Sequence, residues 1–220
     1  MHKTILFLFV TLIIIALTQT SCSAPKHVSK RFEGKLVYEI FVGKEAKQPA
    51  DSSKYQIIYA KDSLLRAESF TPLGKQVFIK HIPKNRAYTL VDMFGEKYAI
   101  QSVPDSLDKL NEKYSFDYKI GKKTIAGKKA NRALVKIVDQ PEEIEMYYFK
   151  DISHDYSSAI PGLKGLPVEY TIFVKGEKLQ YKLVSIEEKT IPLDTFGIPS
   201  NYTKISVTDF MELIKVEEPQ

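Results

Sequence analysis

The side chains best suited to chemistry in this chain are its histidines and its clustered carboxylates, and neither set has the spacing of a known site. Metal-binding histidines usually recur within a few residues, as in the His-Glu-x-x-His motif on a helix. Beyond the first 22 residues the histidines are His27, His81 and His154, which lie far apart. The sequence therefore predicts no metal site and no cofactor.

Carboxylates are the second candidate, because a glycosidase needs two facing acids, one of them with a raised pKa. The acids at 142–145 and 187–188 alternate with strand-forming residues, which is typical of an exposed sheet face. No Gly-x-Ser-x-Gly motif is present to hold a nucleophilic serine. We therefore predict that the chain has no catalytic residues and is not an enzyme. The alternative is a hydrolase of glycan or lipid that uses the scattered acids Glu68, Glu145 or Glu169.

The single thiol of the chain, Cys22, follows a segment typical of a secretory signal peptide. A basic start precedes an apolar run of 13 residues, Ile5 to Leu17, and small residues then lead to the cysteine. The run is too short to span a bilayer, which takes about 20 apolar residues. A lone cysteine at this place resembles a bacterial lipoprotein signal, in which the thiol is acylated and the chain is cut before it. The sequence thus predicts a signal peptide at 1–21, lipidation of Cys22 and a tether at 22–31.

Gln19 departs from the lipoprotein signal, which usually has leucine at this position. Ordinary cleavage of an exported protein is therefore the rival interpretation. In such lipoproteins, an aspartate directly after the lipidated cysteine usually retains the chain in the inner membrane. This chain has Ser23 at that position. We expect an anchor in the outer membrane of a Gram-negative cell, facing the periplasm, and a surface-facing orientation stays open.

Composition narrows the classes of partner. The formal net charge is +5, and the basic residues are spread along the chain. A solvated surface is the expected meaning of this charge, and contact with anionic lipid headgroups is the alternative. An exported protein of this kind is not expected to bind nucleic acid. Because Cys22 has no cysteine partner, packing and backbone hydrogen bonds must stabilise the fold.

Segments rich in β-branched and aromatic residues follow one another from Phe32 onward, separated by turn residues. Regular spacing of this kind predicts a meandering antiparallel sheet in one domain, 32–206, followed by a short helix and tail at 207–220. The expected strands are 32–42, 54–60, 63–70, 75–82, 87–94, 96–102, 115–120, 128–138, 143–149, 168–174 and 179–190.

Three local features refine this prediction. Apolar residues alternate up to Leu183 and then shift by one position to Val184, which predicts a β-bulge that curves the sheet. The segment 104–110 has acidic residues near its start, which predicts a short helix there. After an extended segment, Thr208 is expected to cap a final helix at 209–215.

The densest local pattern is Ala159–Tyr170, which reads AIPGLKGLPVEY. This segment resembles the signature of GLPGLI-type exported proteins of Gram-negative bacteria, a family of unknown function. Lys164 stands where the family string has proline, and Val168 and Glu169 fit the related form Gly-Leu-Pro-x-Glu better. Supporting motifs lie at 32–39, 125–130, 147–152 and 197–202.

At greater distance, this resemblance implies the architecture of the LolA/LolB lipoprotein carriers, in which a curved sheet wraps around short helices and encloses an apolar cavity. The strand pattern and the expected bulge are compatible with that architecture. The expected fold class is therefore mostly β: a single curved, unclosed antiparallel sheet, or half-barrel, with one to three short helices.

The glycines and prolines at 161–167 favour a tight turn, because such a turn needs φ > 0 at one residue and a fixed φ at another. The functional alternative makes this loop a mobile lip of a ligand cavity. The candidate lip residues are Pro161, Gly162, Leu163, Gly165, Leu166 and Pro167.

Aromatic content suggests what such a cavity would hold. The chain has 13 tyrosines and 12 phenylalanines. Segments such as 77–79, 88–91 and 170–174 place apolar residues on both faces of a strand, so that one face can pack the core while the other lines a cavity. The leading hypothesis is that the sheet binds a lipid, an acyl chain or another hydrophobic ligand. A filled core without a ligand is one alternative, and a structural protein that docks another envelope component is the other.

Overall fold

The computed structural model describes residues 31–43, 55–71, 74–84, 86–93, 95–102, 113–138, 140, 142–157, 159–174 and 176–216. The predicted signal peptide, the lipidation at Cys22 and the helix at 104–110 lie outside the described residues.

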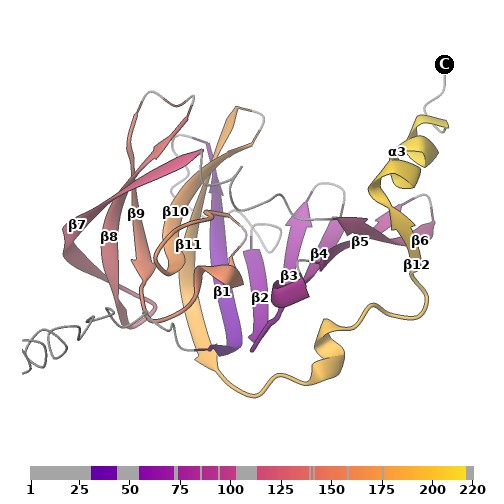
Figure 1. Ribbon diagram of the computed structural model, residues 1–220, viewed down its shortest axis with the longest axis horizontal. Coiled ribbons are helices and arrows are strands. Elements are labelled where there is room, and N and C mark those ends of the chain that lie inside the picture. Colours follow the sequence, from indigo (N-terminus) through magenta and orange to yellow (C-terminus); the bar gives the residue numbers. More distant parts are fainter. Residues whose placement is uncertain are drawn as a thin grey trace, which may run out of the picture.

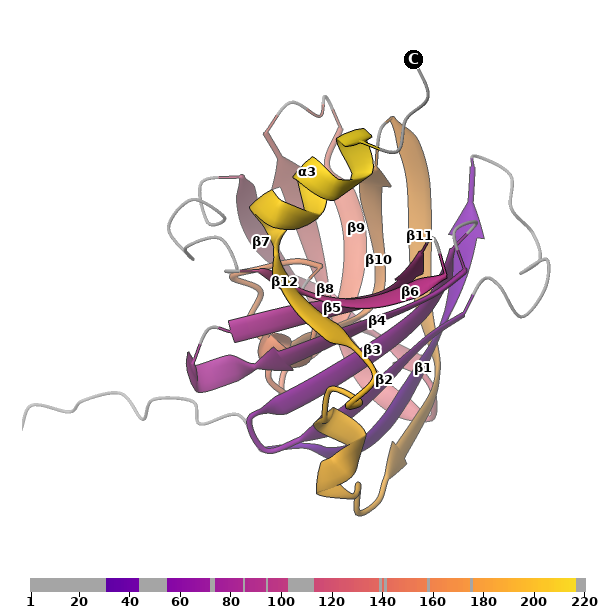
Figure 2. The ribbon, with the colours of Figure 1, turned by 90° about the vertical axis from the view of Figure 1, so that its right-hand side faces the viewer.

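The strands of the described chain form one sheet of 12 strands in the order β12-β6-β5-β4-β3-β2-β1-β11-β10-β9-β8-β7. Neighbouring strands are antiparallel, except that β12 runs parallel to β6. The sheet curves strongly and does not close, so that β2–β6 cross over β7–β11 (Figure 1, Figure 2). The predicted fold class, a mostly-β half-barrel, is confirmed.

The strands are β1 (Glu33–Val42), β2 (Tyr55–Lys61), β3 (Leu64–Thr71), β4 (Gly74–His81), β5 (Arg86–Met93), β6 (Glu96–Ser102), β7 (Tyr114–Ile125), β8 (Lys128–Ile137), β9 (Ile144–Phe149), β10 (Leu166–Val174), β11 (Glu177–Glu188) and β12 (Thr203–Ser206). The helices are the 3₁₀ turns η2 (Ile82–Lys84), η3 (His154–Tyr156) and η4 (Leu193–Phe196), and the α-helix α3 (Val207–Val216).

The central strand β1 shows how the apolar pattern sets the inner face of the sheet. Its residues alternate between buried and partly exposed, with Leu36 and Tyr38 fully buried. Because side chains of a strand point to opposite faces in turn, these two residues lie on the same, inner face. On the neighbouring strand β11, the pairing register skips Val184, which lies between the partners of Val37 and Tyr38. The predicted β-bulge is therefore confirmed.

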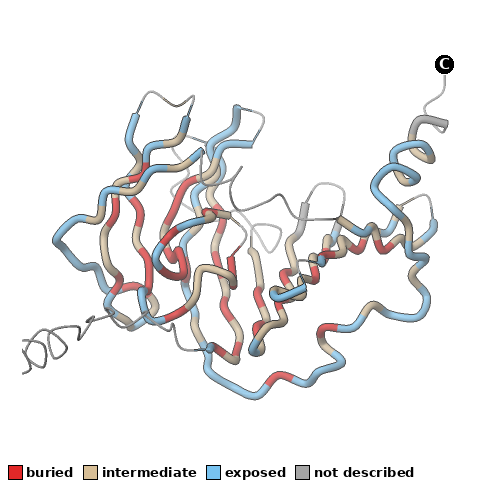
Figure 3. The backbone as a smooth tube through the Cα atoms, in the orientation of Figure 1, coloured by how far each residue is buried: buried red, intermediate tan, exposed pale blue. Residues whose placement is uncertain are grey.

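Within the described part of the chain, the inner face packs against the connection between β9 and β10, residues 150–165, which holds the short 3₁₀ turn η3. Ile152, Ile160 and Leu163 from this connection are each less than 5% exposed and belong to the main core cluster. In Figure 3 the connection carries buried positions beside those of β1 and β8–β11. This connection, which we call the inner loop, covers the middle of the curved sheet.

The outer face of β3–β6 is covered by residues 191–206, which we call the strap (Figure 2). Ile198 and Tyr202 of the strap pack against a second core cluster that contains Val77 and Ile79. The strap is fixed at its start by Glu33, whose Oε1 accepts a hydrogen bond from the backbone N–H of Ile191 at 2.8 Å. Segment 77–79 is therefore apolar on both faces because the strap buries its outer face.

A final helix, α3, is present where the sequence predicts one, and it begins directly after β12, a strand that was not predicted. The cap is Ser206 rather than Thr208, because the Ser206 Oγ accepts a hydrogen bond from the backbone N–H of Asp209 at 3.1 Å. The ring of Phe210 lies 5.8 Å from that of Tyr98 on β6, centroid to centroid. Among the described residues, no helix combines the length and the apolarity needed to cross a membrane.

Candidate ligand-binding cavity on the inner face

A cavity of about 340 Å³ lies between the inner face of the sheet and the inner loop. This volume falls within the range of roughly 300–1,000 Å³ that is usual for small-molecule sites. Side chains from β2, β3, β7, β10, β11 and the inner loop form its wall: Gln56, Ile58, Leu65, Ala67, Tyr114, Tyr156, Ser157, Ala159, Tyr170, Ile172, Phe173 and Tyr181.

Two of the wall tyrosines form a stacked pair. The rings of Tyr170 on β10 and Tyr181 on β11 are 5.0 Å apart at an interplanar angle of 4°. The two residues are direct partners in the β10–β11 register, so that their side chains project from the same face. The pair gives one side of the cavity a flat aromatic surface.

Tyr156 fixes the opposite side of the cavity. Its hydroxyl donates a hydrogen bond to the carbonyl of Asp62 at 2.7 Å and accepts one from the N–H of Phe32 at 3.2 Å. These two bonds tie the inner loop to the β2–β3 turn and to the start of β1. The cavity is therefore held between anchored elements on both sides.

The described residues of the cavity wall carry no charge at neutral pH. Burial raises the pKa of Tyr114, Tyr156 and Tyr181 above the usual tyrosine value. For Tyr170, burial and then the neighbouring Tyr38 and Tyr181 raise the pKa further, although a hydrogen bond with Ser157 opposes the rise. Because these hydroxyls stay protonated and none of the other wall residues is ionisable, the cavity suits the uncharged body of a ligand.

The predicted lip residues lie beside this cavity rather than in its wall. Gly162, Leu163 and Gly165 line a separate hollow of about 720 Å³, together with residues of β9 and the inner loop. The inner-loop residues that reach the aromatic cavity are Tyr156, Ser157 and Ala159. The tight-turn interpretation is confirmed at Gly162, whose φ is 80°.

The buried members of the lip set serve as anchors. Leu163 and Leu166 are 1% and 0% exposed. The N–H of Leu166 donates a hydrogen bond to the carbonyl of Ile152 at 2.9 Å, and the carbonyl of Pro167 accepts one from the Tyr38 hydroxyl at 2.8 Å. Pro161 is partly buried. The role of this loop as a cavity lip stays a prediction.

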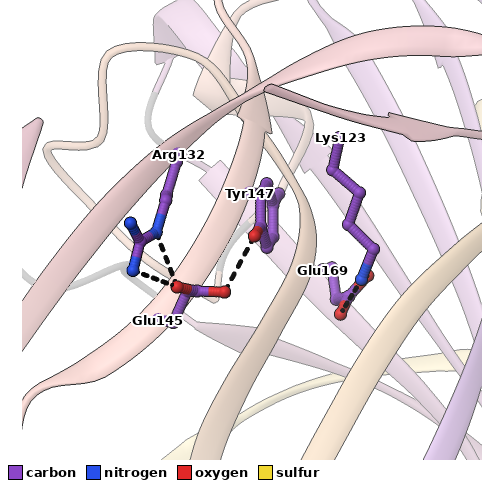
Figure 4. A network of polar contacts seen from close by, with 5 residues as sticks. All are labelled: Lys123, Arg132, Glu145, Tyr147 and Glu169. Carbon is purple, nitrogen blue, oxygen red and sulfur yellow. Dashed lines mark hydrogen bonds and ion pairs between the residues drawn. The ribbon is translucent and has the colours of Figure 1, made fainter. Parts of the chain in front are cut away.

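The three scattered acids that a hydrolase would use are all engaged in ion pairs. Glu145 accepts hydrogen bonds from the Tyr147 hydroxyl at 2.8 Å and from Arg132 Nε at 2.6 Å, and Lys123 Nζ lies 2.8 Å from both carboxylate oxygens of Glu169 (Figure 4). The bond from Tyr147, and then Arg132, holds the pKa of Glu145 below its usual value although slight burial opposes this. A general acid needs a raised pKa instead.

Glu68 on β3 is paired in the same way. Its carboxylate lies 2.7 Å from Arg66 Nε and 2.8 Å from Lys75 Nζ. Burial alone would raise its pKa, but the hydrogen bonds from Lys75 and Arg66 outweigh burial and lower it. These contacts give Glu68 the role of an ion-pair acceptor on the outer face.

Histidines and acids of the described residues form no group of three or more that could hold a metal ion. His81 ends β4, whereas His154 begins η3, where its Nε2 lies 3.6 Å from Asp155 Oδ1. The third histidine, His27, lies outside the described residues.

Sequence reasoning found one part of the cavity and missed the rest. Segment 170–174 was predicted to line a cavity, and it supplies Tyr170, Ile172 and Phe173. The contributions of Leu65, Ala67 and the inner loop were missed, because ordinary core positions give no sequence signal that distinguishes them from a wall. Tyr156 was the one available signal, as an aromatic residue in a turn-rich segment.

No protein-family model and no curated protein matches this chain. Among solved structures, the fold is similar to PNGF-II in a P21 crystal form, with a TM-score of 0.53, 13% identity, and coverage of 82% of this chain and 33% of the PNGF-II chain. A C2 form of PNGF-II gives a TM-score of 0.53 and 12% identity over 82% of this chain and 32% of that one.

An uncharacterized conserved protein from Thermus thermophilus is similar over 82% of this chain and 93% of its own, with a TM-score of 0.47 and 11% identity. From the coverages given for PNGF-II, this chain spans about a third of the length of the PNGF-II chains that it matches. At such low identity the likeness to PNGF-II shows a shared fold only.

Proposed function

We propose that this protein is a non-catalytic, lipid-anchored protein of the cell envelope that binds a hydrophobic ligand, such as a lipid or an acyl chain, in the inner-face cavity. The observation that carries the proposal is the cavity itself, because it is lined by uncharged aromatic and aliphatic side chains. Pockets for apolar ligands have this composition, with a few polar groups for orientation. Gln56 and Ser157 are the polar side chains in the wall that can orient a ligand.

The cavity also has an opening through which a ligand can enter. The inner-face wall residues Gln56, Ile172 and Tyr181 are only partly buried, so that the wall reaches solvent at its edge. The non-catalytic part of the proposal is supported by the ion pairs that occupy Glu68, Glu145 and Glu169.

Filling the cavity tests the binding proposal. Ala159 lies in the wall and is partly exposed, so phenylalanine fits there at little cost to folding and occupies ligand space. We expect Ala159→Phe to bind the fluorescent fatty acid dansyl-undecanoic acid at least about tenfold more weakly than the original protein, since ~1.4 kcal/mol of lost contact changes affinity tenfold. Fluorescence titration measures this loss. Ser185→Phe, on the exposed surface of β11, is the matched control and should bind normally.

Two results would count against ligand binding. One is that the probe gives no saturable signal with the original protein. The other is that Ala159→Phe and Ser185→Phe bind the probe equally well. Native mass spectrometry of protein purified without detergent provides an independent readout, in which a co-purified apolar molecule supports the proposal.

The anchor rests on the sequence signal at Cys22 and has its own test. In cells given labelled palmitate, the original protein should take up label and Cys22→Ser should take up none, because the thiol is the acceptor of the lipid. Export of both proteins is checked by fractionation. Equal labelling of the exported serine variant would rule out lipidation at Cys22.

A second candidate function is docking of another envelope protein along β7. This strand forms one edge of the described sheet, and Ile120 on it is fully exposed. An open edge can accept a strand from a partner. If the function is docking at β7, Ala159→Phe should bind the partner as well as the original protein does. The cavity variant therefore separates the two candidates.

A further inference from the structure

Another pocket, of about 300 Å³, lies on the outer face of the sheet beside the strap, and its lining is strongly basic. The lining includes the basic residues Lys84, Arg86 and Lys204, with His81 among them. Lys80 also borders the pocket, although its side chain projects from the other face of β4 than that of His81. Among the described residues, the lining contains no aspartate or glutamate. We call this site the basic pocket.

The sheet register explains why these side chains converge. His81 on β4 pairs directly with Arg86 on β5, so both side chains project from the same face, next to each other. Lys84 lies in η2, the short turn that joins these two strands. Lys204 lies on β12, the strand that ends the strap, and pairs with Ala99 of β6, which belongs to the outer-face cluster. Three separate segments thus bring positive charge to one place.

The charges of the basic pocket are not neutralised within the described chain. Lys61 on β2, Arg66 on β3 and Lys75 on β4 each form an ion pair with a glutamate. No such pair joins Lys84, Arg86 or any other basic residue of the pocket to an acid among the described residues. Unpaired positive charges held close together repel one another, and a bound anion would remove that repulsion.

One buried atom in this pocket also has no hydrogen-bond partner. His81 Nδ1 is shielded from solvent and unpartnered, the only such side-chain atom that the described residues contain. A buried polar atom without a hydrogen-bond partner lowers the stability of the fold. An imidazole nitrogen that carries a proton can donate a hydrogen bond to an oxygen. Because this atom is shielded from solvent, a ligand oxygen would satisfy it once the His81 ring turns toward the pocket.

The remainder of the pocket is apolar and aromatic. Ile79 and Phe196 are 6% and 8% exposed, and Tyr88 and Ile198 lie at their side. A ligand that fits both parts has an anionic head for the basic residues and an apolar or aromatic group for this floor. Phosphate suits the head best, because it offers several charged acceptor oxygens and arginine binds it with two parallel hydrogen bonds.

We propose that the basic pocket is a binding site for a phosphate group attached to an apolar or aromatic body. The phosphate can belong to a soluble monoester or to a lipid headgroup, which share this chemistry. The site lies on the opposite face of the sheet from the hydrophobic cavity, so it stands or falls independently of the function proposed above.

Titration of the full-length protein with phosphate probes tests this site. Calorimetry with phenyl phosphate and with inorganic phosphate measures the soluble ligands, and sedimentation with phosphatidylcholine vesicles, with and without phosphatidic acid, measures the lipid headgroup. We expect phenyl phosphate to bind more tightly than inorganic phosphate and to shift the NMR signals of the His81 ring. Arg86→Gln should weaken binding by roughly 10- to 100-fold, the equivalent of one charge-assisted hydrogen bond. Lys178→Gln, on the exposed surface of β11, is the charge-matched control.

The outcomes separate the sources of phosphate. Arg86-dependent binding of phenyl phosphate assigns a soluble ester, and Arg86-dependent binding of the phosphatidic acid vesicles alone assigns a lipid headgroup. Either result supports the site. Binding that Arg86→Gln and Lys178→Gln weaken equally, or an unchanged His81 signal at saturation, overturns it. A far-UV circular dichroism spectrum and a urea midpoint equal to those of the original protein show that Arg86→Gln is folded.

Discussion

Replacing Gly165 with alanine is expected to destabilise the protein by about 3 kcal/mol or more, the upper part of the range for overpacked sites. A Cβ atom at this position would lie 2.2 Å from the carbonyl oxygen of Phe149 and 2.8 Å from the Cα of Lys150. Both are backbone atoms, which cannot rotate away as a side chain can. The close approach is what allows Leu166, the next residue, to pair with Phe149 in the β9–β10 ladder.

Urea unfolding followed by circular dichroism measures this effect, and Gly127→Ala is the matched control. Gly127 has φ 77°, and a Cβ there would meet no atom within 4 Å. Alanine at such a position costs about 1–2 kcal/mol for the left-handed backbone alone. Equal losses in the two variants would show that the backbone contact at Gly165 contributes nothing.

The sequence predicted the strands well because local alternation and burial agree. On β1, the apolar positions Leu36, Tyr38 and Ile40 are also the buried ones. The shift of apolar phase at Val184 predicted the bulge, because an inserted residue moves all later side chains to the other face. Such features depend on neighbours in the chain and are visible without a structure.

The parts that the sequence did not predict depend on contacts across long stretches of chain. The strap starts at a hydrogen bond between Ile191 and Glu33, which are 158 positions apart. Its strand β12 pairs in parallel with β6, although the local pattern indicated only an extended segment. The helix cap moved from Thr208 to Ser206 because β12 ends there and leads directly into α3.

The aromatic cavity and the basic pocket show the same limit in predicting functional sites from sequence. The aromatic cavity joins β2 and β3 to β10 and β11, and nothing in the sequence marks Ala67 as a neighbour of Tyr170. The sequence gives His81 no second histidine at the spacing of a metal site. The structure surrounds it with lysine and arginine, a setting that favours an anion over a metal ion.

Tyr38 offers the second test with a large expected effect, because it is fully buried and hydrogen-bonded at the centre of the sheet. Tyr38→Ala is expected to cost about 3–5 kcal/mol, as for other large-to-small core changes. It removes an edge-to-face contact with Tyr170, whose ring centroid lies 6.1 Å away. Urea unfolding again measures the loss.

Tyr38→Phe isolates the hydroxyl, which donates to the carbonyl of Pro167 at 2.8 Å. Burial raises the pKa of Tyr38, so the hydroxyl keeps its proton, and remains a donor, even where an exposed tyrosine would begin to ionise. Phenylalanine would leave the Pro167 carbonyl without this donor, at a cost of about 1–3 kcal/mol. Tyr59→Phe, on the partly exposed surface of β2, should change stability by less than about 0.5 kcal/mol. If both phenylalanine variants are equally stable, the bond that ties β1 to the Gly-Leu-Pro segment does not stabilise the fold.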